Sequence, residues 1–140
     1  MKISAWKAWA YGAVIVLIAS VLPSALIICD KLFDLSRIGR VLSILILLSG
    51  WMPAMAAFVV GYLAPCRKIT LGISMAFLDA LFSIIIGFSY QILGIPTDSI
   101  GITAEIILFA ISLVTSVALC GAGAVLGAVA NREKLELTKN

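Results

Sequence analysis

Asp79 is the residue of this chain whose type and position most suggest chemistry, because its carboxylate lies inside an apolar stretch, 71–93, that is long enough to cross a lipid bilayer. A carboxylate at the bilayer centre costs about 2.5–3.5 kcal/mol on insertion scales, and intramembrane acids carry protons or ions in pumps and transporters. The apolar stretches contain no lysine, arginine or histidine, so we expect no countercharge at this depth. The neutral acid is therefore favoured unless water or a cation reaches it.

Two roles for Asp79 follow from this position. As a neutral acid, it donates a hydrogen bond to Ser83 one turn along the same helical face, to Ser49 of the preceding stretch, or to a free backbone carbonyl, and so joins helices. As a titrating acid, it binds and releases a proton or a cation during transport. The predicted ion or proton site consists of Asp79, Ser83 and Ser49.

The elements that position these residues are four apolar runs, at about 8–28, 41–64, 71–93 and 106–130. Each is about as long as a 30 Å hydrocarbon core requires. The chain of 140 residues is 63% hydrophobic and 12% charged, against about 45–50% and about 25% in soluble domains. The sequence therefore predicts an all-α integral membrane protein, a bundle of four transmembrane helices that forms a single domain over 1–140. The first run exceeds the apolar region of a signal peptide and lacks an A-x-A site, so we expect it to stay uncleaved.

The positions of the basic residues predict the orientation. Lysine and arginine near the ends of membrane spans favour the cytoplasmic side. Seven of them fall on the side of the two termini and three on the opposite side; the seven are Lys2, Lys7, Arg67, Lys68, Arg132, Lys134 and Lys139. We therefore expect both termini in the cytoplasm and a multi-pass location in a plasma (inner) membrane.

Small residues recur at steps of three and four in three of the runs, and small faces let helix backbones approach closely in lipid. The predicted packing residues are Gly50, Ala54, Ala57 and Gly61; Gly72, Ala76 and Gly87; and Gly123 and Gly127. The second group shares its face with Asp79, so that face is expected to look into protein. The GxxxG at Gly123 and Gly127 predicts either packing within the bundle or a dimer face.

Two prolines and Trp51 lie in the interior of the first two runs. Pro23 and Pro53 each remove a backbone donor, so a kink is expected at both positions. Trp51 falls near mid-depth, where its indole N–H needs a partner, so it is expected to face the bundle interior.

Several kinds of chemistry have no support in the sequence. The chain has no histidine and no CxxC, and its three cysteines fall at three different depths, so neither a metal site nor a redox pair is expected. Asp79 has no adjacent base or second buried acid, so we expect no enzyme activity and no cofactor. The scattered basic residues do not predict nucleic-acid binding.

Three functions remain open. The first is a non-enzymatic structural or accessory component that acts through helix packing, with a membrane-protein partner or as a homo-oligomer through Gly123 and Gly127, in contact with the lipid bilayer. The second is a small proton-coupled or cation transporter that uses Asp79. In size and number of helices the chain resembles the small multidrug transporters, although their essential acid lies in the first span and 8–28 has none. The third is a holin-like pore former, suggested by small size and a charged tail.

Overall fold

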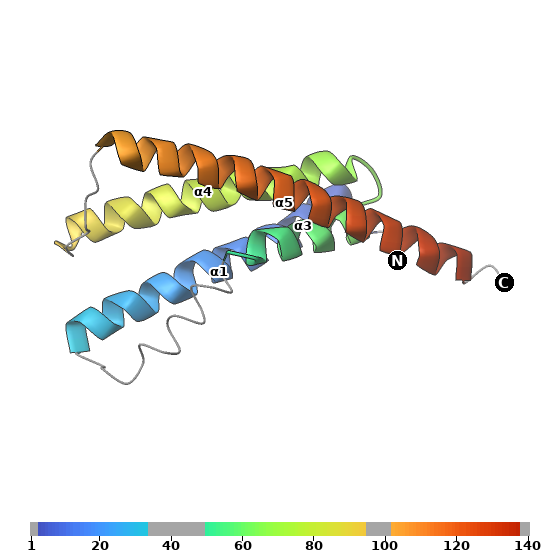
Figure 1. Ribbon diagram of the computed structural model, residues 1–140. Helices are drawn as coiled ribbons and strands as arrows, with labels where there is room; N and C mark the ends of the chain where they lie inside the picture. The colour runs from blue at the N-terminus through green and yellow to red at the C-terminus, as the bar shows by residue number, and fades with distance from the viewer. Residues whose placement is uncertain (1–2, 34–49, 95–101, 138–140) are drawn as a thin grey trace.

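The computed structural model describes residues 3–33, 50–94 and 102–137, which fold into four α-helices (Figure 1). These are α1 (Ala5–Phe33), α3 (Met52–Leu63), α4 (Lys68–Ile92) and α5 (Ile102–Leu137). The described ranges contain no β-strand, and this confirms the predicted all-α class. Helices α1, α4 and α5 are long and apolar enough to cross a membrane, which supports a membrane protein.

Helix α3 is shorter than the predicted second span. It has 12 residues, which rise about 18 Å and so cover little more than half of a hydrocarbon core of about 30 Å. Most of the first half of the predicted span, through residue 49, lies outside the described residues. A fourth complete crossing over 41–64 therefore stays a prediction.

The start of α1 and the end of α5 lie toward the same end of the packed helices, which we call the termini end; the opposite end is the far end (Figure 1). Helices α1 and α4 run from the termini end to the far end, and α3 and α5 run back. This arrangement agrees with an even number of crossings. The cytoplasmic location of the termini stays a prediction.

Helix α3 is the centre of the packing. It contacts α1, α4 and α5, while α4 also contacts α1 and α5, so α1 and α5 lie on opposite sides of this pair. The shared core is built largely from small side chains, which allow the helices to lie close together. The core residues are Ala8, Val16, Ala56, Ala57, Val60, Ala64, Met75, Ala76, Cys120 and Ala124.

The GxxxG of α5 packs on α3 of the same chain. A Cβ added at Gly123 would overlap the carbonyl oxygen of Ala54, and one at Gly127 would overlap that of Phe58. Both glycines are buried. The face that the sequence offers to a dimer is therefore covered by α3.

A second close approach joins three helices at Ala124 of α5. A Cβ added at Gly61 of α3 would lie 2.8 Å from the Ala124 Cα, and one at Gly72 of α4 would overlap the Ala124 Cβ and lie 3.5 Å from that of Ala57. Ala76, one turn beyond Gly72, is also buried. Glycine at 61 and 72, opposite the small side chain of Ala124, leaves room for α3, α4 and α5 to meet here.

The prolines and Trp51 lie as follows. Pro23 is inside α1, which continues to Phe33, and Pro53 is in the first turn of α3, where the missing N–H breaks no helical hydrogen bond. The kinks expected at both positions stay predictions. The predicted interior orientation of Trp51 is wrong: its side chain is 62% exposed, because it precedes α3 and points away from the core.

Polar contacts hold the helices together at the termini end. The Trp9 indole Nε1 donates to the Ser74 Oγ at 3.0 Å, which joins α1 to α4. The Asn131 Nδ2 donates to the Tyr62 carbonyl at 2.7 Å, which joins α5 to α3. Toward the far end, α1 diverges from α4 and α5 (Figure 1). The widening space between α1 and α4 is where the candidate site lies.

Candidate proton site

Asp79 is the twelfth of the 25 residues of α4, so it lies near the middle of a helix that is long enough to span a bilayer. It is about 17 Å along the helix axis from Lys68 at the termini end. Its side chain is half-buried, in the angle between α1 and α5. The structure thus places the carboxyl near the middle of α4 and leaves part of it uncovered.

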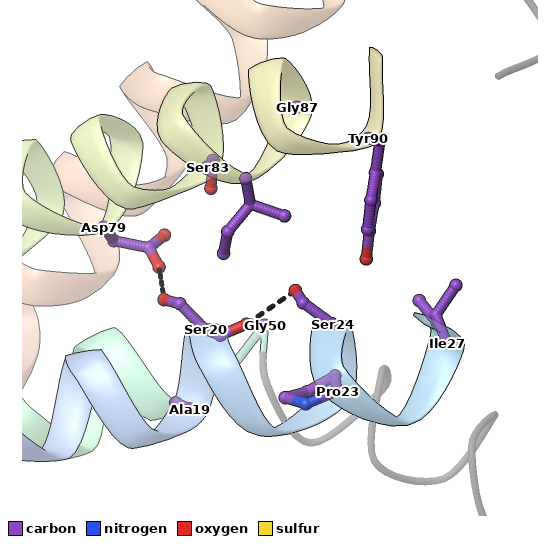
Figure 2. Close-up of a pocket in the computed structure, with 11 residues that line it drawn as sticks. Ala19, Ser20, Pro23, Ser24, Ile27, Gly50, Asp79, Ser83, Gly87 and Tyr90 are labelled. Carbon is purple, nitrogen blue, oxygen red and sulfur yellow. Dashed lines mark hydrogen bonds between the residues drawn. The ribbon is translucent and has the colours of Figure 1, made fainter. Parts of the chain in front are cut away.

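The carboxyl of Asp79 has a partner on α1. The Ser20 hydroxyl lies 3.3 Å from the Asp79 Oδ1 (Figure 2). It also lies 2.9 Å from the backbone carbonyl of Val16. One turn farther along α1, the Ser24 hydroxyl donates to the Ser20 carbonyl at 2.8 Å. Serine hydroxyls in apolar helices commonly bond the carbonyl four residues back. Ser20 does this and also reaches across to α4.

A cleft of about 380 Å³ runs between α1 and α4 beside Asp79. Figure 2 shows Ser83 and Tyr90 pointing from α4 into the space opposite Ser20 and Ser24 of α1. The side chains of the serines, Asp79 and Tyr90 are interspersed with apolar residues, so the cleft is amphipathic along its length. The lining residues are Ala19, Ser20, Pro23, Ser24, Ile27, Gly50, Asp79, Ser83, Ile86, Gly87 and Tyr90.

A second, smaller cavity of about 50 Å³ lies on the other side of Asp79, between α4 and α5. Ser112 and Ser116 of α5 line it together with Asp79 and Ser83. A cavity of this size holds at least one water, for which the carboxyl and the hydroxyls provide the two to four polar partners that buried water needs. Asp79 therefore borders a cavity that contains serine hydroxyls on each side of α4.

The surroundings of Asp79 are polar but uncharged. The linings of both cavities include no lysine or arginine among the described residues. Cys120 of α5 is close enough to interact electrostatically with Asp79, and Tyr90 is the other titratable group in the cleft. Hydroxyls are thus the main partners that the described part of the chain offers to either form of the acid. No cluster of three histidine, cysteine or acidic side chains that would suit a metal occurs there.

The residues predicted from the sequence are distributed as follows. Ser83 lines both cavities with Asp79, whereas Ser49 lies outside the described residues. Gly50 and Gly87 line the cleft, and an added Cβ at Gly87 meets nothing described within 4 Å, so this glycine does not mediate a close helix contact. The remaining predicted packing residues lie at the helix contacts described above.

Sequence reasoning did not place Ser20 and Ser24 in the site. The signal was available, because Ser20 lies 15 residues after the start of α1 and Asp79 lies 11 residues after the start of α4, which puts both near mid-depth. Counting residues from the helix starts gives the depth of Ser20 but does not tell which face of α1 packs against α4. Ser112 and Ser116 of α5 are likewise residues of the site that the sequence did not place near Asp79.

Comparison of the chain with known protein families, with curated proteins and with solved structures finds no match in any of the three. The function must therefore be argued from the site alone.

Proposed function

We propose that this protein is a small, non-enzymatic proton-coupled or cation transporter in which Asp79 is the group that takes up and releases the transported charge. The observation that carries the proposal is that the Asp79 carboxyl lies at mid-depth on a cleft of about 380 Å³ rather than inside a closed helix contact. An acid that only ties helices together needs no such access.

The hydrogen bonds of Ser20 support a proton on Asp79 in this conformation. A serine hydroxyl has one proton to donate. The shorter of its two contacts, 2.9 Å, is to the Val16 carbonyl, and the contact with Asp79 is 3.3 Å. The Ser20 hydroxyl is placed to donate to the Val16 carbonyl and to the Asp79 Oδ1, but its one proton serves one of these acceptors at a time. When it serves Val16, a protonated Asp79 supplies the second proton by donating to the Ser20 oxygen. The site therefore suits the neutral acid without further rearrangement.

The described walls of the two cavities carry no countercharge for Asp79, so a bound proton is what neutralises the carboxylate. An ionised Asp79 without lysine or arginine nearby requires water or a cation in the cleft, whereas the protonated acid is satisfied by hydroxyls. Proton binding thus exchanges a hydrated, charged site for a neutral one. A transporter can couple this exchange to movement of α1 against α4, which the Ser20 contact joins.

The test is labelling of the protein in native membranes with a hydrophobic carbodiimide over a pH series, read by intact mass. The reagent reacts with the protonated carboxyl, so adduct formation at Asp79 is expected to fall as the pH rises. Asp79→Asn removes the reactive group and keeps the shape, so it must abolish this adduct. Glu105 is exposed in the first turn of α5, and its labelling at the lowest pH of the series shows that the reagent is active toward an accessible carboxyl.

Transport is then measured in proteoliposomes that contain a pH-sensitive dye. A potassium diffusion potential is expected to drive proton entry with the wild-type protein and not with Asp79→Asn, while both variants elute at the same size from a sizing column. Labelling of Glu105 without any labelling of Asp79 would contradict the proposal, because it would show that the acid is sealed. Equal proton entry with Asp79→Asn would contradict it independently.

The second candidate is a structural or accessory membrane component, in which Asp79 only ties helices together. The Ser20 contact favours this role, because it joins α1 to α4 where the two helices have begun to diverge. In that case Asp79→Asn and Ser20→Ala change stability or binding of a membrane-protein partner and leave the membranes equally impermeable to protons. The proton-entry assay separates the two candidates before any partner is known.

A further inference from the structure

We infer that the cleft between α1 and α4 is a water-filled half-channel that gives Asp79 access to protons from the far end only, while the core closes the route from the termini end. This inference rests on the proposed role of Asp79 and adds to it the side from which the proton arrives.

The polar groups of the cleft are spaced for water. Ser83 is four residues beyond Asp79 on α4, and Ser24 is four residues beyond Ser20 on α1. Four residues rise about 6 Å along a helix, which is about twice the usual distance between hydrogen-bonded oxygens. One water therefore bridges each successive pair of side chains, and the backbone of α1 offers further acceptors.

The cleft extends from mid-depth to the far end. Tyr90 is 11 residues beyond Asp79, so the lined path is about 17 Å long, close to half of a 30 Å hydrocarbon core. At the density of liquid water a volume of 380 Å³ holds on the order of ten molecules. A chain of this length and volume connects the carboxyl to the headgroup level, where the Tyr90 ring and hydroxyl stand in the opening (Figure 2).

The opposite direction is closed by a layer of fully buried side chains. Each lies about one helical turn nearer the termini end than the polar residue of its own helix: Val16 below Ser20, Met75 below Asp79, and Cys120 below Ser116. Val60 of α3 and Ala124 of α5 are also fully buried and belong to the same core. Close-packed apolar side chains leave no space for a chain of waters.

The inference is tested by cysteine accessibility with the cationic, membrane-impermeant reagent 2-(trimethylammonium)ethyl methanethiosulfonate. The background carries Cys29→Ser and Cys66→Ser, because both of these cysteines are exposed, and retains Cys120 as a buried reference. Single cysteines are placed in the cleft with Ser24→Cys or Ser83→Cys. The matched control is Leu81→Cys, which lies at nearly the depth of Ser83, is 52% exposed and is not part of the cleft lining.

Reagent is added to sealed vesicles of each orientation, and a protease-sensitive tag at the N-terminus reports which side holds the termini. Ser24→Cys and Ser83→Cys are expected to react from the far side at least about tenfold faster than from the termini side, because methanethiosulfonates require a hydrated thiolate. Leu81→Cys faces lipid and is expected to react from neither side, as is Cys120.

The possible outcomes are distinct. Reaction of the cleft cysteines from the termini side, or from neither side, overturns the half-channel. If this happens while carbodiimide still labels Asp79 in a pH-dependent way, the proton-carrying role survives and only the direction of access is wrong. If the cleft cysteines react from the far side and Asp79 never labels, the half-channel exists and the carrier role fails.

Discussion

The close contact between α5 and α3 predicts opposite effects for the same substitution at two glycines. In Gly127→Ala the new methyl group overlaps the Phe58 carbonyl oxygen and lies 2.8 Å from the Tyr62 backbone nitrogen. Both neighbours are backbone, which cannot rotate away as a flexible side chain does. In Gly87→Ala the methyl group meets no described atom within 4 Å. The second variant is thus a matched control for the first.

The magnitude follows from two opposing effects. Alanine is favoured over glycine inside a helix by about 1 kcal/mol, so Gly87→Ala is expected to stabilise the protein by up to that amount. Gly127→Ala gains the same propensity but separates α3 from α5, and overpacking a close contact costs about 1–3 kcal/mol. The free energies of unfolding of the two variants should therefore differ by about 1–3 kcal/mol, with Gly127→Ala the less stable.

The assay uses a buried thiol as the reporter of unfolding. With Cys29→Ser and Cys66→Ser in the background, a thiol-reactive fluorophore reports exposure of Cys120 as the purified protein is heated in mild detergent. At about 2–4 °C per kcal/mol, the two midpoints should be separated by roughly 2–12 °C. Equal midpoints for Gly127→Ala and Gly87→Ala would refute the close packing of α5 on α3.

Three further predictions follow, of which the first two use the same background. Ser20→Ala removes the partner of Asp79, so we expect a loss of about 0.6–1.7 kcal/mol in unfolding free energy in the melting assay; an unchanged midpoint would contradict the contact. Trp9→Phe keeps the ring but loses the bond to Ser74, and a loss of similar size is expected in the same melting assay, whereas an unchanged midpoint would show that the bond adds nothing. In the unsubstituted protein, Cys120 is expected to stay unmodified by a small maleimide while the other two cysteines react, as mass spectrometry can show; early modification of Cys120 would contradict its burial in the core.

The membrane character of the protein could be predicted from the sequence, because it depends on local properties. About 20 consecutive apolar residues are enough to fill a bilayer, whatever their neighbours are. The runs at 8–28 and 106–130 accordingly lie within α1 and α5, and the run at 71–93 extends one residue beyond the end of α4. Asp79 stood out for the same reason, since a single carboxylate in such a run is costly wherever the other helices lie.

The surroundings of the acid required the tertiary structure. A helical run gives the spacing of Ser20 and Ser24 but not the direction in which their face points, because lipid and protein are about equally apolar and impose little periodicity on α1. Only the packing of α1 on α4 brings Ser20 to Asp79 and leaves a cleft between the two helices on the far-end side of this contact. Trp51 shows the same limitation: depth along the chain did not tell which way its side chain would point.

The small residues illustrate the division most clearly. The sequence determined that Gly123 and Gly127 form one narrow face of a helix, because a spacing of four residues places them one above the other. The sequence did not decide whether this face packs against a second copy of the protein or against another helix of the same chain. Only the tertiary structure decided for α3, through carbonyl oxygens at Ala54 and Phe58 that leave no room for a Cβ. The partner is determined by the position of these backbone carbonyls on α3, and the spacing of glycines within α5 contains no information about that position.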